Sequence, residues 1–399
     1  MNAWTPSLAT RLTRRDLLRL TALLSGTCAI PRLSRAADAL EPVRVGYLPI
    51  TDAAPLLIAH ARGLFAAEGL RVEPPRVFRS WAQLVEAFMA GQVNVVHLLS
   101  PIPVWARYGA AQFPMKVVAW NHMAGSAITV GLQIRSVRDL AGKRVAVPFW
   151  YSIHNVVLQH WLREEGLVPV TKGNEPPKAN EVALVVMAPA DMGPALVSGA
   201  IAGFTVAEPF NAAAELQGIG RILRFTGDIW REHACCVVTL HERDLSTRPE
   251  WSERVVTAIV RAQHWLRSHR AEGARLLARD GPGRYTPHPV PTLERVLVED
   301  AARERDYVRT GAIRHPEWKE ERINFQPYPF ASYTELLIRL LKQTQLEGDR
   351  SFLAALDPAF VARDLVDDRA VRKAVLALGG LKAFGLPESF TRSETLKIG

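Results

Sequence analysis

Cys235 and Cys236 carry the most reactive side chains of this sequence, and His233 stands two positions before them. Thiolates and imidazole bind transition metals, but contiguous ligands pack poorly around one ion unless further donors join them. A disulfide between adjacent cysteines would be strained and would close no long loop. Two small buried residues at the start of a strand are the simplest alternative. We therefore predict no metal ligand and no cofactor, and we leave the state of the two sulfur atoms open.

Ser80 and Trp81 open a segment with helical spacing and are a second candidate binding element. The first turn of a helix offers free N–H groups and the positive end of the helix dipole, and both attract an anion. The indole of Trp81 adds a flat face for stacking on a ligand. The alternative for Trp81 is a core or interlobe aromatic. For His154, at the start of a later helical pattern, the alternative is a capping or core histidine.

Catalysis and nucleic-acid binding both lack their usual sequence signals. The Gly-x-Ser-x-Gly elbow, the phosphate loop and His-Glu-x-x-His are missing from the sequence. The formal net charge is +9, but residues 1–37 hold six arginines and one acidic residue and so supply five of these charges. The remaining charges are interspersed, without a run of five of one sign. We expect neither an enzyme nor a nucleic-acid-binding protein.

The first 37 residues have the order of a twin-arginine signal peptide. Arg14-Arg15 precede an apolar stretch over residues 20–30, and small residues surround Ala37, where a peptidase would cut. That stretch is too short for a bilayer crossing, which needs about 20 apolar residues. A lipid anchor on Cys28 is disfavoured, because the residue directly before it is unsuitable for lipoprotein processing. The alternative to a signal peptide is an amphipathic helix that contains an arginine pair by chance. We predict export to the periplasm.

Alternating strands and helices must position the candidate residues. Short β-branched runs end at Gly or Pro and precede apolar residues at helical spacing, which is typical of a parallel sheet covered on both faces. The predicted strands are 43–49, 70–77, 93–99, 115–120, 127–132, 144–148, 182–187, 203–206 and 237–240, and the predicted helices are 56–65, 81–90, 136–143, 154–165, 192–198 and 250–278. A chain of 399 residues is too long for one compact domain, which predicts two lobes.

An ordered series of segments resembles the nitrate, sulfonate and bicarbonate family of periplasmic substrate-binding proteins of ABC transporters, especially its nitrate- and bicarbonate-binding branch. The segments are 45–56, 63–70, Ser80-Trp81-Ala82, Gly125-Ser126-Ala127-Ile128-Thr129, 154–162, Ala207-Glu208-Pro209-Phe210-Asn211-Ala212, 227–233 and 324–329. No single segment is specific, and their order along nearly the whole chain after the leader carries the resemblance. Several of them fall where a strand is followed by a helix, the place where open α/β folds bind ligands.

The resemblance implies a set of ligand-binding residues between two lobes. They are Thr51, Asp52, Ser80, Trp81, Ser126, His154, Glu208, Cys235 and Cys236. Trp81 would cover the ligand, and His154 would donate a hydrogen bond to it. Glu208 precedes a proline and is therefore held extended, so it has a purely structural alternative.

Two departures from the family pattern bear on the ligand. Ser126 stands where nitrate binders of the family have a glutamine, and Cys235-Cys236 stand where they have an acid-lysine pair. Because the lysine that would neutralise nitrate is missing, the resemblance does not carry nitrate itself to this chain. The missing acid likewise removes support for the calcium site of bicarbonate binders. Two thiols are weak donors and suit a less polar or sulfur-tolerant ligand.

The resemblance implies an α/β protein with the type II periplasmic-binding fold, in which hinge strands join two lobes. We expect lobe 1 at 43–132 and 241–330, lobe 2 at 133–240 and a helical C-terminal extension at 331–399. The implied function is to capture a small, anionic solute resembling nitrate, bicarbonate or a sulfonate and to deliver it, as a monomer, to the permease and ATPase of an ABC importer. The alternatives are an enzyme similar to thiamine-pyrimidine synthases, which share the general fold and a cysteine-rich stretch, and a ligand sensor that acts on a partner protein.

Overall fold

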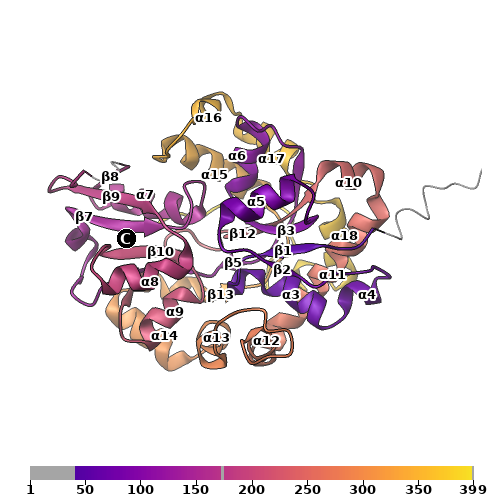
Figure 1. Cartoon of the computed structure of the whole chain (residues 1–399), viewed down its shortest axis with the longest axis horizontal. Coiled ribbons are helices and arrows are strands. Elements are labelled where there is room, and N and C mark those ends of the chain that lie inside the picture. The colour runs from indigo at the N-terminus through magenta and orange to yellow at the C-terminus, as the bar shows by residue number, and fades with distance from the viewer. Residues whose placement is uncertain (1–40, 172–174, 398–399) are drawn as a thin grey trace, which may run out of the picture. The chain divides into compact units, whose positions relative to one another are not determined.

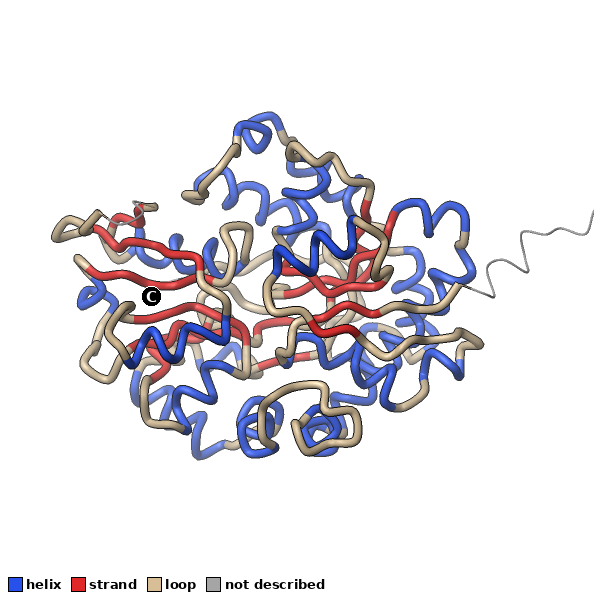
Figure 2. Tube along the Cα trace, viewed as in Figure 1, coloured by secondary structure: helices blue, strands red, loops and turns tan. Residues whose placement is uncertain are grey.

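The computed structural model describes residues 41–171 and 175–397, in which the strands form two main sheets, each at the centre of an α/β lobe (Figure 1). The predicted signal peptide, with Cys28, lies outside the described residues. None of the described helices combines the length and the apolar composition that a membrane crossing needs. Figure 2 shows the strands of the two lobes as two groups with helices around both.

The sheet of lobe 1 has the strand order β2-β1-β3-β12-β4. Its strands are β1 (Val45–Tyr47), β2 (Arg76–Val77), β3 (Val95–Leu99), β4 (Met115–Trp120) and β12 (Cys236–His241). β1 runs parallel to β2 and β3, whereas β12 runs antiparallel to β3 and β4, with Cys236 opposite Leu99 and Val237 opposite Trp120. The first residues of β12 therefore lie at the sheet edge where β3 and β4 end. Ligands of open α/β folds bind at that kind of edge.

The sheet of lobe 2 has the strand order β11-β6-β10-β7-β9-β8. Its strands are β6 (Ser126–Val130), β7 (Lys143–Val147), β8 (Val168–Val170), β9 (Glu181–Val186), β10 (Gly203–Ala207) and β11 (Arg221–Phe225). The four strands β10, β7, β9 and β8 are parallel, and β6 is antiparallel to both of its neighbours. A two-stranded pair, β5 (Met123–Ala124) with β13 (Ile323–Asn324), lies outside both sheets.

Helices pack around both sheets, and most of the predicted ones are present. In lobe 1 they are α3 (Ala54–Ala61), α4 (Leu64–Ala67), α5 (Trp81–Met89), α6 (Ile102–Tyr108), α10 (Glu242–Thr247), α11 (Pro249–Ser268) and α12 (Arg270–Leu277), and in lobe 2 they are α7 (Ile153–Glu164), α8 (Pro189–Val197) and α9 (Phe210–Leu216). Short 3₁₀ turns are η1 (Thr51–Ala53), η2 (Val137–Leu140) and η3 (Pro316–Trp318). The helix predicted at 56–65 is two helices, because Gly63 takes a positive φ of 66° between them.

The chain crosses between the lobes at 121–125 and returns at 226–235, which differs from the predicted boundaries. β6 was expected in lobe 1 and pairs in the sheet of lobe 2, while β12 was expected in lobe 2 and pairs in the sheet of lobe 1. Backbone pairing decides this assignment, and a strand's residues do not reveal which sheet it joins. The segment with α13 (Val290–Leu297) and α14 (Ala301–Thr310) also packs on lobe 2, where the rings of Tyr307 and Phe225 lie 4.9 Å apart.

The C-terminal part is helical and contacts both lobes. Its helices are α15 (Ala331–Gln343), α16 (Ser351–Ala355), α17 (Pro358–Leu365) and α18 (Arg369–Ala377), followed by the 3₁₀ turn η4 (Leu381–Phe384). α17 and α18 pack on β4 of lobe 1. The carbonyl oxygen of Gln345 accepts hydrogen bonds at 2.8 and 3.3 Å from Gln159 and Asn155 of α7 in lobe 2. The helical extension therefore ties the two lobes together.

Candidate functional site

Three predicted site residues and one further residue lie together at the edge of the lobe 1 sheet where its parallel strands end. Asp52 lies in η1, a few residues after β1, and His122 follows β4 by two residues. Cys235 and Cys236 enter the same edge from the opposite direction, because β12 is antiparallel to β3 and β4. All four side chains are fully buried. One ligand atom from each lies within 4.8 Å of the others.

A single carboxylate oxygen is the centre of this cluster. Asp52 Oδ2 lies 3.3 Å from Cys235 Sγ, 3.2 Å from Cys236 Sγ and 2.8 Å from His122 Nε2. The thiols donate to the carboxylate, but His122 Nε2 is not aligned for a hydrogen bond with it. The second oxygen, Asp52 Oδ1, has no hydrogen-bond partner among the described residues. Three polar atoms thus lie close to Asp52 Oδ2, whereas Asp52 Oδ1 has no hydrogen-bond partner among the described residues.

Both cysteine side chains reach the same carboxylate although they are adjacent in the sequence. Successive side chains of a regular strand point to opposite faces. Cys235 lies at a bend between the isolated bridge of Ala234 with Met123 and the first residue of β12. The bend interrupts the alternation, so the two sulfur atoms point the same way. Both are free thiols in the structure.

Lobe 2 contributes two further polar side chains to the cluster. Ser126 begins β6, and His154 lies in the first turn of α7, whose N-cap is Ser152. Ser126 Oγ lies 2.9 Å from His154 Nε2 and 3.4 Å from Cys235 Sγ, and His154 Nε2 lies 3.7 Å from that sulfur. Cys235 is therefore the point where polar groups of the two lobes meet.

Several buried polar atoms around the cluster have no hydrogen-bond partner among the described residues. They are Asp52 Oδ1, Trp81 Nε1, Asn121 Oδ1, His122 Nε2, His154 Nδ1 and His233 Nδ1. Buried polar groups are nearly always hydrogen-bonded, since each unmet donor or acceptor costs about 1–3 kcal/mol. The unmet groups make this cluster and its surroundings the candidate ligand site.

Burial and close charges shift the pKa values of the cluster strongly. Burial raises the pKa of Asp52 to about 7, against the opposing effect of His122. Burial alone would lower the pKa of His122, but the carboxylate of Asp52 raises it to about 10. Burial also opposes ionisation of Cys235, yet hydrogen bonds from Cys236 and the nearby histidines bring its pKa well below the ordinary value. Burial and the neighbouring Cys235 raise the pKa of Cys236. Cys235 is thus the thiol that ionises first.

Thr51 and Glu208 belong to an ion-pair network beside the cluster. Thr51 donates from its amide and its hydroxyl to the carbonyl oxygen of Glu208, both at 3.0 Å. The carboxylate of Glu208 is turned to Arg322, at 2.6 Å, and accepts from the amide of Ala212 at 3.1 Å. Arg322 also contacts Glu215 at 3.2 Å. Glu208 is therefore a buried structural partner of Arg322. Because the two residues are far apart in the sequence, no local pattern could reveal this pair.

Ser80 and Trp81 lie one layer away from the cysteines. Ser80 caps α5 by accepting a hydrogen bond from the amide of Gln83 at 3.3 Å, as expected for a helix start. The Trp81 ring is buried edge-to-face against His97, with centroids 5.4 Å apart. His97 Nε2 accepts from the amide of Leu48 at 3.1 Å. His97 therefore lies between Trp81 and the cluster.

Sequence reasoning did not select His122 or His97. His122 follows the predicted strand at 115–120, so its place after a strand end was the available signal. His97 lies within the buried strand β3 and gave no such signal. His233 was noted beside the thiols, but its Nε2 bonds Thr226 Oγ1 at 2.9 Å and does not face the cysteines through that atom.

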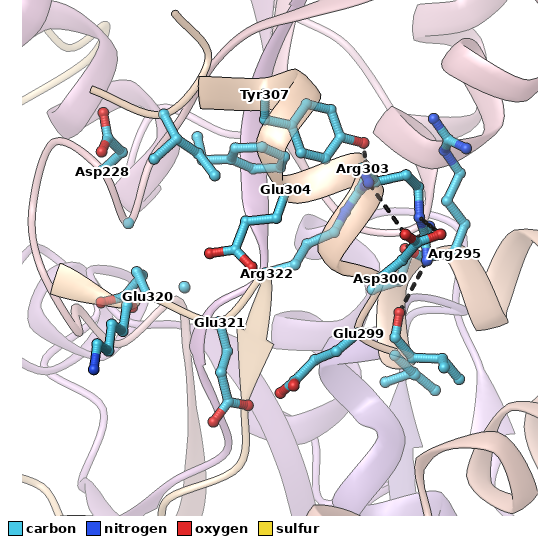
Figure 3. A pocket seen from close by; sticks show the side chains of 18 of the residues that line it. Asp228, Arg295, Glu299, Asp300, Arg303, Glu304, Tyr307, Glu320, Glu321 and Arg322 are labelled. Atoms are coloured by element: carbon cyan, nitrogen blue, oxygen red, sulfur yellow. Dashed lines mark hydrogen bonds and ion pairs between the residues drawn. The ribbon is translucent and has the colours of Figure 1, made fainter. Parts of the chain in front are cut away.

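A larger cavity of about 500 Å³ opens beside the cluster, where α13, α14 and residues 313–322 line it. Its walls carry many charges, and Figure 3 shows Arg303 against Asp300, with Arg322 beneath Tyr307. Most of these charges have partners: Arg303 Nε bonds Asp300 at 3.0 Å, and Arg322 bonds the Tyr307 hydroxyl at 2.8 Å. Ser126 lines this cavity as well as contacting Cys235. The cavity has apolar as well as charged walls and lies beside the fully buried cluster.

The curated proteins that the chain resembles are transport proteins. The nitrate/nitrite-binding protein NrtA of Nostoc sp. is 27% identical over 243 residues, which are 56% of this chain and 53% of that protein. The nitrate import ATP-binding protein NrtC of Synechococcus elongatus is 30% identical over 57% of this chain and 35% of that protein. The chain spans about half the length of the nitrate-binding relatives that it matches.

The fold predicted from the sequence is confirmed by a solved structure. The periplasmic nitrate-binding protein NrtA from Synechocystis PCC 6803 superposes with a TM-score of 0.70, covering 89% of this chain and 93% of that chain at 20% identity. The two α/β lobes and the helical C-terminal part therefore share the fold of that protein. The model of the NMT1-like family matches residues 36–279, which is more than half of the sequence. The family resemblance of the sequence is confirmed, and the chain belongs to the NMT1-like family.

Proposed function

We propose that this chain is the substrate-binding component of an ABC importer, which captures a small solute between two lobes and delivers it to a membrane permease. The buried cluster carries this proposal, because polar groups of both lobes meet at Cys235 while several of their neighbours have no partner. Membership of the family and the transport proteins among its relatives support the same function.

Lobe closure is the proposed mechanism. The segments at 121–125 and 226–235 are the two strand-to-strand crossings, and they carry His122 and Cys235. A ligand that contacts these residues together with Ser126 or His154 binds the closed arrangement better than an open one. It shifts the equilibrium by that difference in affinity and by no more.

A small oxyanion is the first solute class to test. Ser126 and His154 offer hydrogen-bond donors, and the relatives named above include nitrate/nitrite-binding proteins. The carboxylate of Asp52 would repel an anion at this position. Because burial raises the pKa of Asp52 to about 7, we expect anion binding to weaken as the pH rises through that value.

The proposed partners are the permease and the ATPase of the importer, with the chain as a monomer in the periplasm. Export by the twin-arginine route is part of this proposal. An ATP-binding protein of nitrate import is among the relatives, which supports a partner of that class. The charge distribution gives no reason to add a nucleic acid or a lipid surface as a partner.

Solute uptake by the host, together with solute binding in vitro, tests the function. Thermal unfolding of the purified chain is measured with nitrate, nitrite, bicarbonate, sulfonates, small carboxylates and metal ions, and uptake of any ligand is compared with and without the gene. His154→Gln should weaken binding and uptake, whereas His160→Gln, on the same helix, should leave both unchanged. Normal uptake in the deletion strain would refute the importer role.

A further inference from the structure

Asp52, His122, Cys235 and Cys236 have the donor atoms of a transition-metal site. Two sulfur atoms, one imidazole nitrogen and one carboxylate oxygen come together from three separate parts of the chain. Tetrahedral sites built from sulfur and nitrogen ligands are typical of zinc. We propose that these four side chains bind one thiophilic divalent transition-metal ion of the zinc type.

The separations of the donors suit a tetrahedron. With metal–sulfur bonds of about 2.3 Å and metal–nitrogen or metal–oxygen bonds of about 2.0–2.1 Å, the edges of a tetrahedral site are about 3.4 Å for N···O and about 3.6 Å for S···O. The corresponding separations here are 2.8 Å between His122 and Asp52, and 3.2 and 3.3 Å between the sulfurs and Asp52. To admit the ion, the cluster would open by about 0.6 Å between His122 and Asp52 and by about 0.3–0.4 Å between each sulfur and Asp52.

The orientation of His122 supports a shared third partner. Its Nε2 lies close to Asp52 Oδ2 but is not directed along a hydrogen bond. Two ligand atoms have this relation when both face a common centre. His122 Nδ1 lies 3.4 Å from the carbonyl oxygen of Met123, which can only accept. That contact leaves Nε2 as the nitrogen for the metal, in the arrangement common for metal-binding histidines.

Neighbouring groups hold the other ligands in place. Ser126 and His154 contact Cys235 Sγ from lobe 2, and Asn121 donates from its side chain to the backbone carbonyl oxygen of Asp52. Hydrogen bonds of this kind fix the direction of metal ligands and adjust their affinity. They also place a contact from lobe 2 on a ligand of lobe 1, so an ion bound here would strengthen the junction of the two lobes.

The second oxygen of Asp52 is an independent observation. Asp52 Oδ1 is fully buried without a hydrogen-bond partner among the described residues. An ion at the cluster would be coordinated by His122 Nε2 and would attract the negative charge of the Asp52 carboxylate. The thiols and the imidazolium lose protons when the ion binds, because metal ligands must be deprotonated. A divalent ion then balances two of the three negative charges of the carboxylate and the thiolates.

This site deepens the proposed function while its existence does not depend on it. If the chain serves an importer, which rests on the proposed function, the metal ion at the interlobe cluster is the alternative to a small oxyanion as the solute that it carries. The purified chain binds the ion whether or not a permease reads the closed form. Metal binding in vitro and solute uptake in cells therefore fail or succeed separately.

The test is a metal-binding measurement on the full chain, kept reduced and first stripped with a chelator. Zinc is added, free zinc is removed by gel filtration, and the metal content per chain is measured by mass spectrometry. Cobalt(II) replaces zinc in a second titration, since thiolate-to-cobalt charge-transfer bands and intense tetrahedral ligand-field bands report sulfur ligands directly. We expect one ion per chain and both sets of bands.

Matched variants locate the site. Cys236→Ser and His122→Gln should weaken zinc binding by more than about 100-fold, which exceeds the usual effect of a residue that only supports a ligand. His241→Gln changes a buried histidine of the same strand that contacts neither sulfur and should leave zinc affinity unchanged. Circular dichroism and the metal-free unfolding midpoint show that each variant is folded.

Two results would overturn the metal site. One is reduced, folded wild-type protein that retains neither zinc nor cobalt at micromolar concentrations. The other is zinc binding that survives in folded Cys236→Ser and His122→Gln variants without thiolate-to-cobalt bands. Metal binding with normal uptake of the ion in the deletion strain would keep the site and refute only its role in import.

Discussion

A buried histidine lies near an aspartate at each end of β12, but the surroundings of the two pairs differ. At the first end, Asp52 and His122 meet two thiols, and no lysine or arginine among the described residues pairs with Asp52. At the other end, His241 lies 4.0 Å from Asp244, which pairs with Arg248 at 2.6 Å and Arg243 at 3.5 Å. The carboxylate near arginines already has its counter-charge, whereas the one near thiols does not. Whether a buried aspartate forms an ion pair or is available to bind a metal ion therefore depends more on neighbouring cations than on the residue type.

Removing the cation at the second end should have the largest effect on stability. Arg248→Gln leaves Asp244 buried without its closest partner, and breaking such a pair typically costs about 3–5 kcal/mol. Urea denaturation measures the loss. The control is Arg309→Gln, which breaks an exposed pair with Asp306 and should cost under about 1 kcal/mol. Equal small losses in both variants would mean that Asp244 does not depend on Arg248.

Replacing each of the two aspartates by asparagine tests which end of β12 binds the metal. Asp52→Asn keeps the shape of the side chain but removes the charge, so zinc affinity should fall by more than about 100-fold. Asp244→Asn should change zinc affinity by less than about twofold. Competition with a chromophoric chelator measures both affinities on folded protein. A fall in affinity for Asp244→Asn as large as that for Asp52→Asn would refute the proposed difference between the ends.

Metal addition should stabilise the wild-type protein and not the Asp52 variant. At a free zinc concentration one hundred times the dissociation constant, the free energy of unfolding should rise by about 2.7 kcal/mol. Asp52→Asn at the same zinc concentration should show little change. Paired urea titrations, with zinc and with chelator, give the difference. Equal stabilisation of both proteins would place the bound zinc somewhere other than this cluster.

The smallest effect is a pH dependence of opposite sign at the two ends in metal-free protein. Burial opposes the charge of His122, but Asp52 raises its pKa from 6.5 to about 10, so its contribution to stability is complete below pH 6.5 and is lost as the pH rises toward 10. Burial lowers the pKa of His241, so its contribution is present above pH 6.5 and is lost as the pH falls below it. Unfolding free energies of His122→Gln and His241→Gln, compared with wild type from pH 5 to 10, measure both. The same sign for both would contradict this assignment.

Much of the fold could be predicted because its signals are local. β3, β4, β9, α5 and α7 lie within about two residues of their predicted ranges, since buried strands and capped helices are marked by neighbouring residues. The helix predicted at 136–143 is present as the shorter 3₁₀ turn η2, which Ser136 and Asp139 begin with a capping box. The lobe boundaries were less accurate, because sheet membership depends on pairing partners far away in the sequence. α6 begins in the proline-containing stretch after β3 and was not predicted.

The candidate site was predicted in part. Asp52, Ser126, His154, Cys235 and Cys236 lie together in the structure, and their role in ligand binding stays a prediction. Glu208 and Thr51 are engaged in the network with Arg322, and Trp81 lies behind His97. The prediction of no metal ligand rested on the scarcity of donors near the two cysteines in sequence. Two further donors, Asp52 and His122, are distant in sequence and adjacent in space.

The sequence by itself determined the strand and helix pattern, the family resemblance and the presence of two adjacent thiols, because these features lie within short stretches of chain. Only the tertiary structure decided that a bend at Cys235 turns both sulfur atoms to one side and that Asp52 arrives from 183 residues away to meet them. A carboxylate, an imidazole and two thiols become one site only when separate strands end at the same sheet edge, since coordination and ion pairing act over a few ångströms and are independent of sequence separation.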